Sequence, residues 1–255
     1  MKIKMISTYF PEQVLTTEML SKEFPELSSK RIINKIGIRK RYISHKAEYA
    51  SDMAVAASEK LLSSGIDRNS IDYIILCTQS PDYLLPTTAC LVQSRLKLRM
   101  EIGAIDVNLG CSGYVYALSL AYGLIKTKQV NTVLIITSDT YTKFLDKNDK
   151  TVRAIFGDAA TATIVTQSKN EEGSAFFSFG TNGDGAKNLI LKNSGTKAIL
   201  NEHSTPRLYM NGPEIMNFVL NIIPYAYNRL INESKVQTDR KLFKKLNYRD
   251  QIYYW

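Results

Sequence analysis

Runs of apolar residues alternate with helix-length segments along the first half of the chain. The runs at residues 71–77, 102–107 and 132–136 are almost continuously apolar, the pattern of strands covered on both faces in a parallel sheet. The segments between them contain stretches with helical spacing, which predict helices of about ten to fifteen residues. Strands that alternate with helices of this length predict an α/β fold.

Flanking segments extend this pattern toward the amino terminus. Alternation at residues 2–9 predicts a first strand, and a short helix is expected at 16–24. A longer helix is predicted at 52–63, with Ser51 as its N-cap because a serine oxygen can accept from the first free backbone N–H groups. Gly65 is expected to end that helix.

A polar break at residues 170–173 is the expected domain boundary, which gives one half at 1–172 and another at 173–255. A proline inside an apolar helical pattern removes a backbone donor, so Pro224 should kink or end its helix. Periodicity fades after Ser234, and the tail is unpatterned. The elements predicted beyond the boundary are strands at 175–179 and 188–192 and a helix at 215–231.

Cys111 stands where the apolar run at 102–107 passes through a Gly-Cys-Ser-Gly turn into a predicted helix. A helix amino terminus presents free N–H groups that stabilise a thiolate. Gly110 and Gly113 would let a substrate approach the sulfur closely. Spacing alone leaves a second interpretation equally open, namely that Cys111 is a small buried residue that packs the strand against the helix. The other two cysteines, Cys77 and Cys90, are expected in the core.

The amino-acid composition limits the classes of protein to which this chain can belong. The 255 residues are 44% hydrophobic and 22% charged, which is ordinary for a globular chain. No apolar run reaches the ~18 residues that span a bilayer, so any membrane contact would be peripheral. An odd number of cysteines and the absence of a long apolar signal region near Met1 favour a reducing cytoplasm.

A net charge of +9 predicts attraction to an acidic partner. Basic residues cluster at 30–41 and at 235–249. The second cluster lies in the unpatterned tail, where solvated charges are expected. Neither cluster carries zinc-ligand spacing or the aromatic-glycine signature of an RNA-binding domain, so a nucleic-acid partner is disfavoured.

Six short motifs follow one another along the chain: GIRKRYI at 37–43, LPTTAC at 85–90, IDVNLGCSGY at 105–114, FGDAA at 156–160, NGDG at 182–185 and MNGPE at 210–214. In order and spacing, these motifs resemble 3-oxoacyl-(acyl carrier protein) synthase III, a family of thiolase-like condensing enzymes. The resemblance covers about residues 1–230.

The resemblance implies a thiolase-like layered α/β sandwich, usually dimeric, whose amino-terminal half carries Cys111 as the nucleophile. Cys111 would take an acyl group from a thioester, and a decarboxylated malonyl thioester would then attack the acyl group, in fatty-acid or related biosynthesis. Backbone N–H groups held by the turn at Gly110 and Gly113 would form part of an oxyanion hole.

The resemblance also implies the surroundings of that cysteine. Leu85 and Thr87 would line an acyl pocket. The substrates would be phosphopantetheine thioesters, carried by acyl carrier protein or coenzyme A, with no permanently bound cofactor and no metal. The residues expected to contact the carrier or its phosphopantetheine are Arg31, Lys35, Arg39 and Arg153.

This chain departs from the family in two respects. Arg31 and Lys35 occupy positions where coenzyme A-dependent members often have an adenine-stacking tryptophan and an arginine, which favours acyl carrier protein as the donor; plain surface charges are an equal alternative. The family's carboxy-terminal histidine and asparagine, which stabilise the enolate, have no counterpart, because the only histidines are His45 and His203. We therefore expect a truncated or frame-shifted chain with an incomplete second half.

Three functions follow as alternatives: a condensing enzyme, a chain that only transfers acyl groups, and a non-catalytic homologue or a subunit that associates with an intact one.

Overall fold

The computed structural model describes residues 1–168, 175–198 and 205–234. The chain forms two units: Met1–Met19, Lys40–Lys143 and Phe156–Ala175 make the first, and Leu20–Arg39, Phe144–Ile155 and Phe176–Trp255 make the second. The expected boundary at 172, the unpatterned tail, the basic cluster at 235–249 and His203 all lie outside the described residues.

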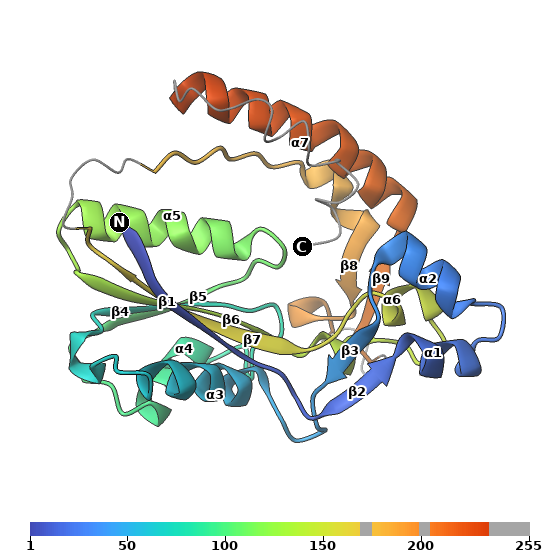
Figure 1. The fold of residues 1–255 in the computed structure, drawn as a ribbon, viewed down its shortest axis with the longest axis horizontal. Helices are drawn as coiled ribbons and strands as arrows, with labels where there is room; N and C mark the ends of the chain where they lie inside the picture. Colours follow the sequence, from blue (N-terminus) through green and yellow to red (C-terminus); the bar gives the residue numbers. More distant parts are fainter. Residues whose placement is uncertain (169–174, 199–204, 235–255) are drawn as a thin grey trace. The chain divides into compact units, whose positions relative to one another are not determined.

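A five-stranded mixed sheet forms the centre of the first unit (Figure 1). Strand β4 runs parallel to both β5 and β6, whereas β7 is antiparallel to β6 and to β1. In sheet order, the strands are β1 (Lys2–Tyr9), β7 (Ala159–Thr166), β6 (Thr132–Asp139), β4 (Tyr73–Cys77) and β5 (Gly103–Val107). The predicted α/β fold is confirmed.

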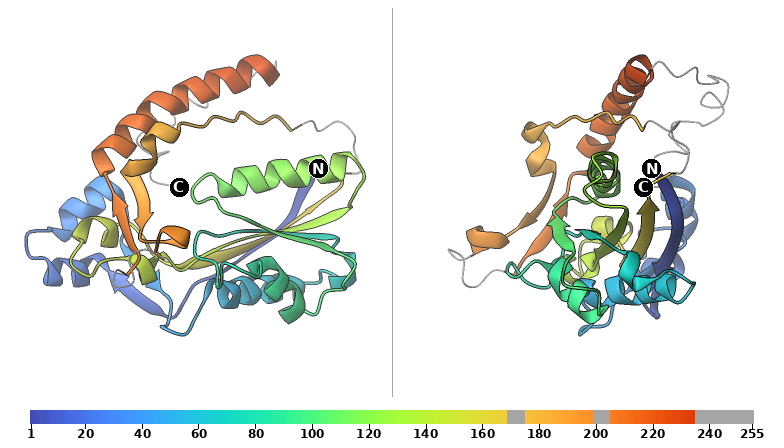
Figure 2. Two further views of the ribbon diagram at one scale, coloured as in Figure 1. Left: turned by 180° about the vertical axis from the view of Figure 1, so that it is seen from behind. Right: turned by 90° about the vertical axis from the view of Figure 1, so that its left-hand side faces the viewer.

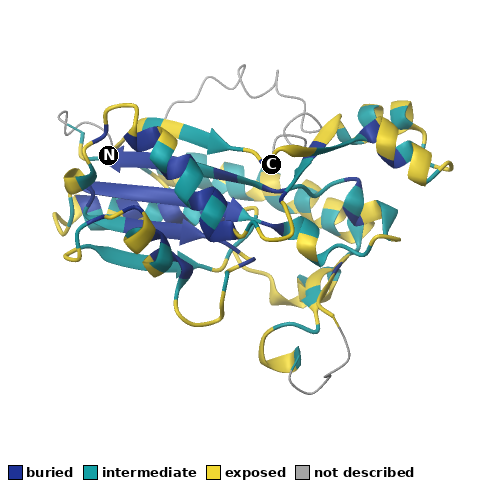
Figure 3. Cartoon of the chain, turned by 90° about the horizontal axis from the view of Figure 1, so that it is seen from below, coloured by how far each residue is buried: buried dark blue, intermediate teal, exposed yellow. Residues whose placement is uncertain are grey.

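Helices cover both faces of this sheet, and the side chains of strand β4 alternate between two apolar clusters. Ile74 and Leu76 belong to the cluster beneath α3 (Ala50–Leu62) and α4 (Thr88–Arg95). The next side chain, Ile75, belongs to the cluster under α5 (Gly113–Lys126) on the opposite face. Figure 2 shows α5 along one face, and Figure 3 shows the central strands in the colour of buried residues. The sequence of β4 is continuously apolar because both faces of the strand are buried.

Helix α3 begins earlier than predicted. Tyr49 is its N-cap, and the Asp52 carboxylate accepts a hydrogen bond from the Tyr49 backbone N–H at 2.7 Å. Ser51 lies inside the helix, where its hydroxyl donates to Asp82 at 2.6 Å. The predicted N-cap was therefore wrong, because an acidic residue three positions after Tyr49 provides the capping bond instead.

Shorter elements complete the first unit. Strands β2 (Gln13–Thr16) and β3 (Lys40–Ile43) pair antiparallel. The predicted short helix is present as α1 (Thr17–Glu23), whose residues from Leu20 onward belong to the second unit. Two 3₁₀ turns are η1 (Arg68–Ser70) and η2 (Tyr141–Phe144).

The second unit contains a two-stranded sheet and helices. Residues 175–179 form no strand, so that prediction was wrong. Helix α7 continues through Pro224, since the loss of one N–H group leaves the remaining bonds of a 23-residue helix in place. The elements of the second unit are α2 (Ser29–Ile36), α6 (Lys150–Arg153), η3 (Gly183–Asn188), β8 (Leu189–Lys192), η4 (Gly195–Ala198), β9 (Arg207–Met210) and α7 (Gly212–Ser234).

Candidate active site

The carboxyl ends of β4, β5 and β6 meet at one edge of the sheet, because the three strands are parallel. Gln79 follows β4, Cys111 follows β5, and Asp139 ends β6 with Tyr141 close behind. Edges of this kind are where parallel sheets carry their functional groups. The candidate site is built here, within the first unit.

Cys111 lies in a tight turn between β5 and α5. The Gly113 N–H donates to the Gly110 carbonyl at 2.8 Å. Ser112 is the N-cap of α5, and its carbonyl accepts from Val115 and Tyr116, each at 3.1 Å. Cys111 is therefore one residue before the N-cap of α5, in the turn itself. Its side chain is exposed, which argues against the interpretation of a buried packing residue.

Gly113 brings this turn against strand β4. A Cβ atom at Gly113 would lie 3.4 Å from Cys77 Cβ, and the Cys77 thiol donates to the Gly113 carbonyl at 3.2 Å. Burial raises the pKa of Cys77 to about 12, and the nearby Asp139 and Asp106 carboxylates add to the rise. Cys77 is thus a protonated core thiol, as expected, whereas Cys90 is exposed and its predicted place in the core was wrong.

Two polar side chains lie against the residue that precedes the cysteine. A Cβ atom at Gly110 would stand 2.5 Å from Gln79 Oε1 and 3.2 Å from Tyr141 Oη, so a side chain at position 110 would displace the Gln79 amide. The Tyr141 hydroxyl donates a short hydrogen bond to Gln79 Oε1. Burial, followed by the Asp139 and Cys111 charges, raises the pKa of Tyr141 well above its ordinary value. The phenol is therefore a protonated donor.

Asp139 joins the ends of β6 and β4. Its Oδ1 atom accepts from the backbone N–H groups of Gln79 at 2.7 Å and Ser80 at 3.1 Å, and from the hydroxyls of Ser80 at 3.0 Å and Thr78 at 3.2 Å. Burial raises the pKa of Asp139 to about 6, although these hydrogen bonds act in the opposite direction. The carboxyl group fixes the backbone of Gln79 beside the Cys111 turn.

Asp158 anchors the segment that carries Tyr141. It is buried, and its carboxylate accepts from the backbone N–H groups of Ser44 at 2.8 Å and Thr142 at 2.9 Å and from both hydroxyls. The ring of Phe156 packs on Tyr141 with 5.2 Å between centroids. Asp158 therefore has a structural role, because its oxygens are engaged by these donors.

The residues predicted to line an acyl pocket lie before α4. Leu85 is 84% exposed and precedes a cis peptide bond to Pro86, and Thr87 is the N-cap of α4. The Asp106 carboxylate binds the amino terminus of that helix, accepting from Thr88 N and Ala89 N at 2.8 Å each. The acyl-pocket role of Leu85 and Thr87 stays a prediction.

The predicted carrier-binding residues belong to the second unit. Arg31 and Lys35 are exposed and lie one turn apart on α2, and Arg39 is exposed beyond that helix. Arg153 is engaged within its own unit, because it pairs with Glu23 at 2.5 Å and donates to the Lys147 carbonyl at 2.8 Å. Their role toward a carrier also stays a prediction.

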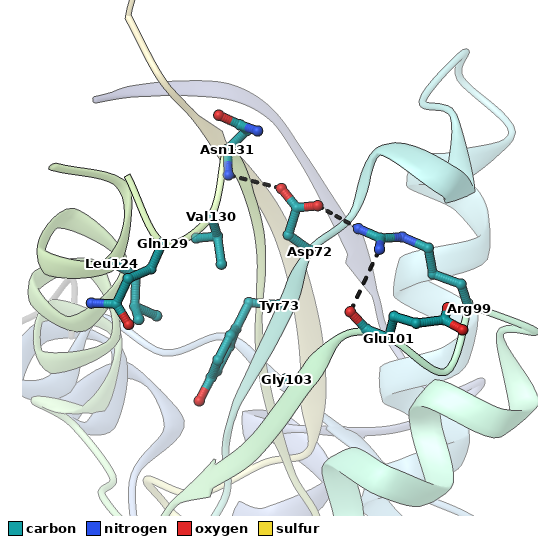
Figure 4. A pocket seen from close by; sticks show the side chains of 9 residues that line it. All are labelled: Asp72, Tyr73, Arg99, Glu101, Gly103, Leu124, Gln129, Val130 and Asn131. Carbon is teal, nitrogen blue, oxygen red and sulfur yellow. Dashed lines mark hydrogen bonds and ion pairs between the residues drawn. The ribbon is translucent and has the colours of Figure 1, made fainter. Parts of the chain in front are cut away.

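A pocket of about 410 Å³ lies at the opposite edge of the sheet, at the amino ends of the parallel strands (Figure 4). The Asp72 carboxylate there accepts from Asn131 N at 2.8 Å and Thr132 N at 3.0 Å and also pairs with Arg99. Both carboxylate oxygens are occupied by protein groups. We therefore interpret this corner as a structural junction between strands.

Sequence reasoning singled out Cys111, Gly110 and Gly113 but missed Gln79, Asp139 and Tyr141. A usable signal existed, since these residues directly follow or end strands that were predicted to be parallel neighbours. In the ranges that the structure describes, no group of three or more His, Cys, Asp or Glu side chains is placed to hold a metal. Within the same ranges no helix is long and apolar enough to cross a membrane.

This fold and the exposed cysteine after strand β5 define the class of thiolase-like α/β proteins. The family model of 3-oxoacyl-[acyl-carrier-protein] synthase III matches residues 105–185, which include Cys111. The beta-ketoacyl-[acyl-carrier-protein] synthase III of Ehrlichia canis is 34% identical over 233 residues, 91% of this chain and 72% of that protein. The chain belongs to the beta-ketoacyl-[acyl-carrier-protein] synthase III family.

Solved structures give the same result. A 2.1 Å crystal structure of a 3-oxoacyl-(acyl-carrier-protein) synthase III is 43% identical with a TM-score of 0.84, covering 91% of this chain and 74% of that one. The corresponding enzyme of Thermus thermophilus is 32% identical with a TM-score of 0.79, covering 92% and 72%. The family resemblance seen in the sequence motifs is confirmed.

Proposed function

We propose that the chain is an acyltransferase of fatty-acid biosynthesis that condenses an acyl group held on Cys111 with a malonyl thioester. The observation that carries this proposal is the exposed Cys111 at the junction of β5 and α5, inside the segment that the family model matches. The names of the relatives give the reaction class and acyl carrier protein as the carrier.

The chemistry proceeds in two steps. The Cys111 thiolate, formed by loss of its proton to solvent, attacks the acyl carbonyl carbon; the donor's C–S bond breaks and the carrier leaves as a thiol. A malonyl thioester then loses CO₂, and the electron pair left on its α-carbon attacks the acyl-enzyme and releases the Cys111 thiolate. Covalent capture thus divides one difficult condensation into two easier steps. A backbone N–H group aimed at the tetrahedral oxyanion is worth about 2.7–4 kcal/mol.

A second candidate function is acyl transfer without condensation, because thioester exchange at Cys111 needs no group to stabilise an enolate. Of the two histidines in the sequence, His45 lies in an exposed turn of the first unit and its Nδ1 accepts from Ala47 N at 3.4 Å. This position gives His45 no evident role beside a carbanion.

Acyl carrier protein is the proposed donor. The net charge of +9 attracts an acidic carrier. Arg31, Lys35 and Arg39 present exposed positive charge from the second unit, and we propose them as contacts, with Arg153 beside them. The absence of an aromatic residue at position 31 disfavours stacking of the coenzyme A adenine. Cytoplasmic location is part of the same proposal, because an exposed reactive thiol is best preserved in a reducing compartment.

The test is a condensation assay with the full chain, malonyl-acyl carrier protein and an acyl thioester on either acyl carrier protein or coenzyme A. We expect 3-oxoacyl product and CO₂ in equal amounts from the parent, none from Cys111→Ala, and a faster reaction with the acyl carrier protein donor. Transfer of the acyl group without CO₂ release would favour the second candidate. A faster reaction with coenzyme A would reject the proposed carrier.

A further inference from the structure

Gln79 and Tyr141 place a hydrogen-bonded amide and phenol directly beside the candidate nucleophile. Both approach the backbone of Gly110, at 2.5 Å and 3.2 Å from where a Cβ atom would stand. Consecutive Cα atoms are about 3.8 Å apart, so this polar pair is one residue away from Cys111. The Cys111 charge also contributes to the raised pKa of Tyr141, which places the sulfur within electrostatic range of the phenol.

Neighbouring residues hold Gln79 and Tyr141 in place. The Gln79 backbone N–H donates to Asp139 at 2.7 Å, which fixes the residue at the end of β4. Tyr141 packs on the ring of Phe156, and its neighbour Thr142 is bound by Asp158. Restraint of the supporting residues keeps a hydrogen-bonding group in place before a substrate arrives, so less entropy is lost on binding.

The side-chain amide of Gln79 has hydrogen-bond donors that a substrate can use. Tyr141 donates to Gln79 Oε1, which orients the carboxamide and leaves its NH₂ group as a pair of donors. Among the residues that the structure describes, no protein group accepts from that nitrogen. Gln79 and Cys111 are both exposed, so the donors and the thiol are open to the same incoming molecule.

A saturated hydrocarbon chain cannot accept from this amide, whereas an oxygen substituent can. Covering the NH₂ group with an alkyl chain would leave a desolvated donor without a partner, which costs about 1–3 kcal/mol. A site that holds such a donor discriminates strongly against the analogue that lacks the matching oxygen.

We propose that Gln79, oriented by Tyr141, is a specificity-determining residue that donates to an oxygen on the acyl group bound for Cys111. The preferred substrates are then short acyl thioesters with a hydroxyl or oxo group on the third carbon, in preference to unsubstituted acyl groups of equal length. This inference rests on the proposed function, because it assumes that Cys111 accepts the acyl group.

The test compares 3-hydroxybutyryl and butyryl thioesters of one carrier, with the rate of Cys111 acylation followed by intact mass. The parent should favour the hydroxylated group by about tenfold, as expected for one good hydrogen bond to a desolvated donor. Gln79→Leu should bring the ratio close to one mainly by acylating faster with butyryl. Tyr141→Phe should give an intermediate ratio, since the amide stays but loses its orienting bond. Gln129→Leu, an exposed glutamine beyond the far end of α5, should keep the parent's ratio.

Equal acylation rates with the two thioesters in the parent would overturn this inference and leave the proposed function intact. An unchanged ratio of the two rates in Gln79→Leu would do the same. If neither thioester labels the parent while iodoacetamide alkylates Cys111, the proposed function fails and the inference falls with it.

Discussion

The ionisation of Asp139 should affect stability in mildly acidic solution. Burial raises its pKa from 3.8 to about 6 in the folded chain. The folded state therefore keeps a proton that the unfolded state releases near pH 4. The stability contributed by the protonated carboxyl group is fully present below pH 3.8 and is lost as the pH rises through 6.

This linkage predicts a difference between the parent and Asp139→Asn, which cannot ionise at this position. The free energy of unfolding of the parent relative to the variant should fall by up to about 3 kcal/mol between pH 4 and pH 6.5, at 1.36 kcal/mol per pH unit, and stay level above that. Urea unfolding of both proteins across this range measures it. A relative stability that rises or stays constant between pH 4 and pH 6.5 would contradict a raised pKa.

At the residue scale, the sequence identified Cys111 because an apolar run ending in a glycine-flanked cysteine is a local pattern. Gln79 and Tyr141 carry no local pattern, since their importance depends on three strands ending at one edge. Ser51 was misjudged for a related reason: the Asp52 carboxylate caps α3, while the Ser51 hydroxyl bonds Asp82 far along the chain.

At the scale of elements, β4 and β5 depend on a contact between an aromatic ring and a glycine. Tyr73 pairs with Gly103 in the strand register, and a Cβ atom at Gly103 would meet the Tyr73 ring at 2.1 Å. The ring also lines the pocket at the amino ends of these strands (Figure 4). A side chain at position 103 would force the ring out of its place.

Gly103→Ala should therefore destabilise the first unit by about 1–3 kcal/mol, the usual cost of overpacking. In a Tyr73→Ala background the same substitution should cost much less, because the clashing ring is gone. A double-mutant cycle of unfolding free energies measures the coupling. Equal costs of Gly103→Ala in the two backgrounds would show that the ring is not the cause.

The elements of the sheet were predictable because burial on both faces of β4 and β6 demands continuous apolar residues. The prediction failed at 175–179, where three phenylalanines imitate a strand. Pro224 does not end its helix, because a long helix tolerates the missing donor. Partner strands and helix length are not properties of a short window of sequence.

At the scale of the whole molecule, the loop before α4 is the clearest surface for self-association. Tyr83, Leu84 and Leu85 are 62%, 82% and 84% exposed, and adjoining exposed apolar side chains are typical of an interaction site. We propose that a second copy of the chain covers this loop in a homodimer.

Leu84→Asp should shift the dimer toward monomer, because burying a carboxylate in an apolar contact is costly. Sedimentation velocity of the parent and the variant measures this shift. Met100, which is 87% exposed, offers a matched control, and Met100→Asp should leave the association unchanged. A parent that sediments as a monomer, or a Leu84→Asp variant that remains dimeric, would contradict the proposed interface.

Cys111 is the proposed acyl acceptor, and intact mass after incubation with acyl-acyl carrier protein measures whether it takes up the acyl group. The parent and Cys90→Ala, which lacks the other exposed cysteine, should each gain the mass of one acyl group. Folded Cys111→Ala should gain none. A parent that stays unmodified, or an adduct that persists in Cys111→Ala and disappears in Cys90→Ala, would show that Cys111 is not the acyl acceptor.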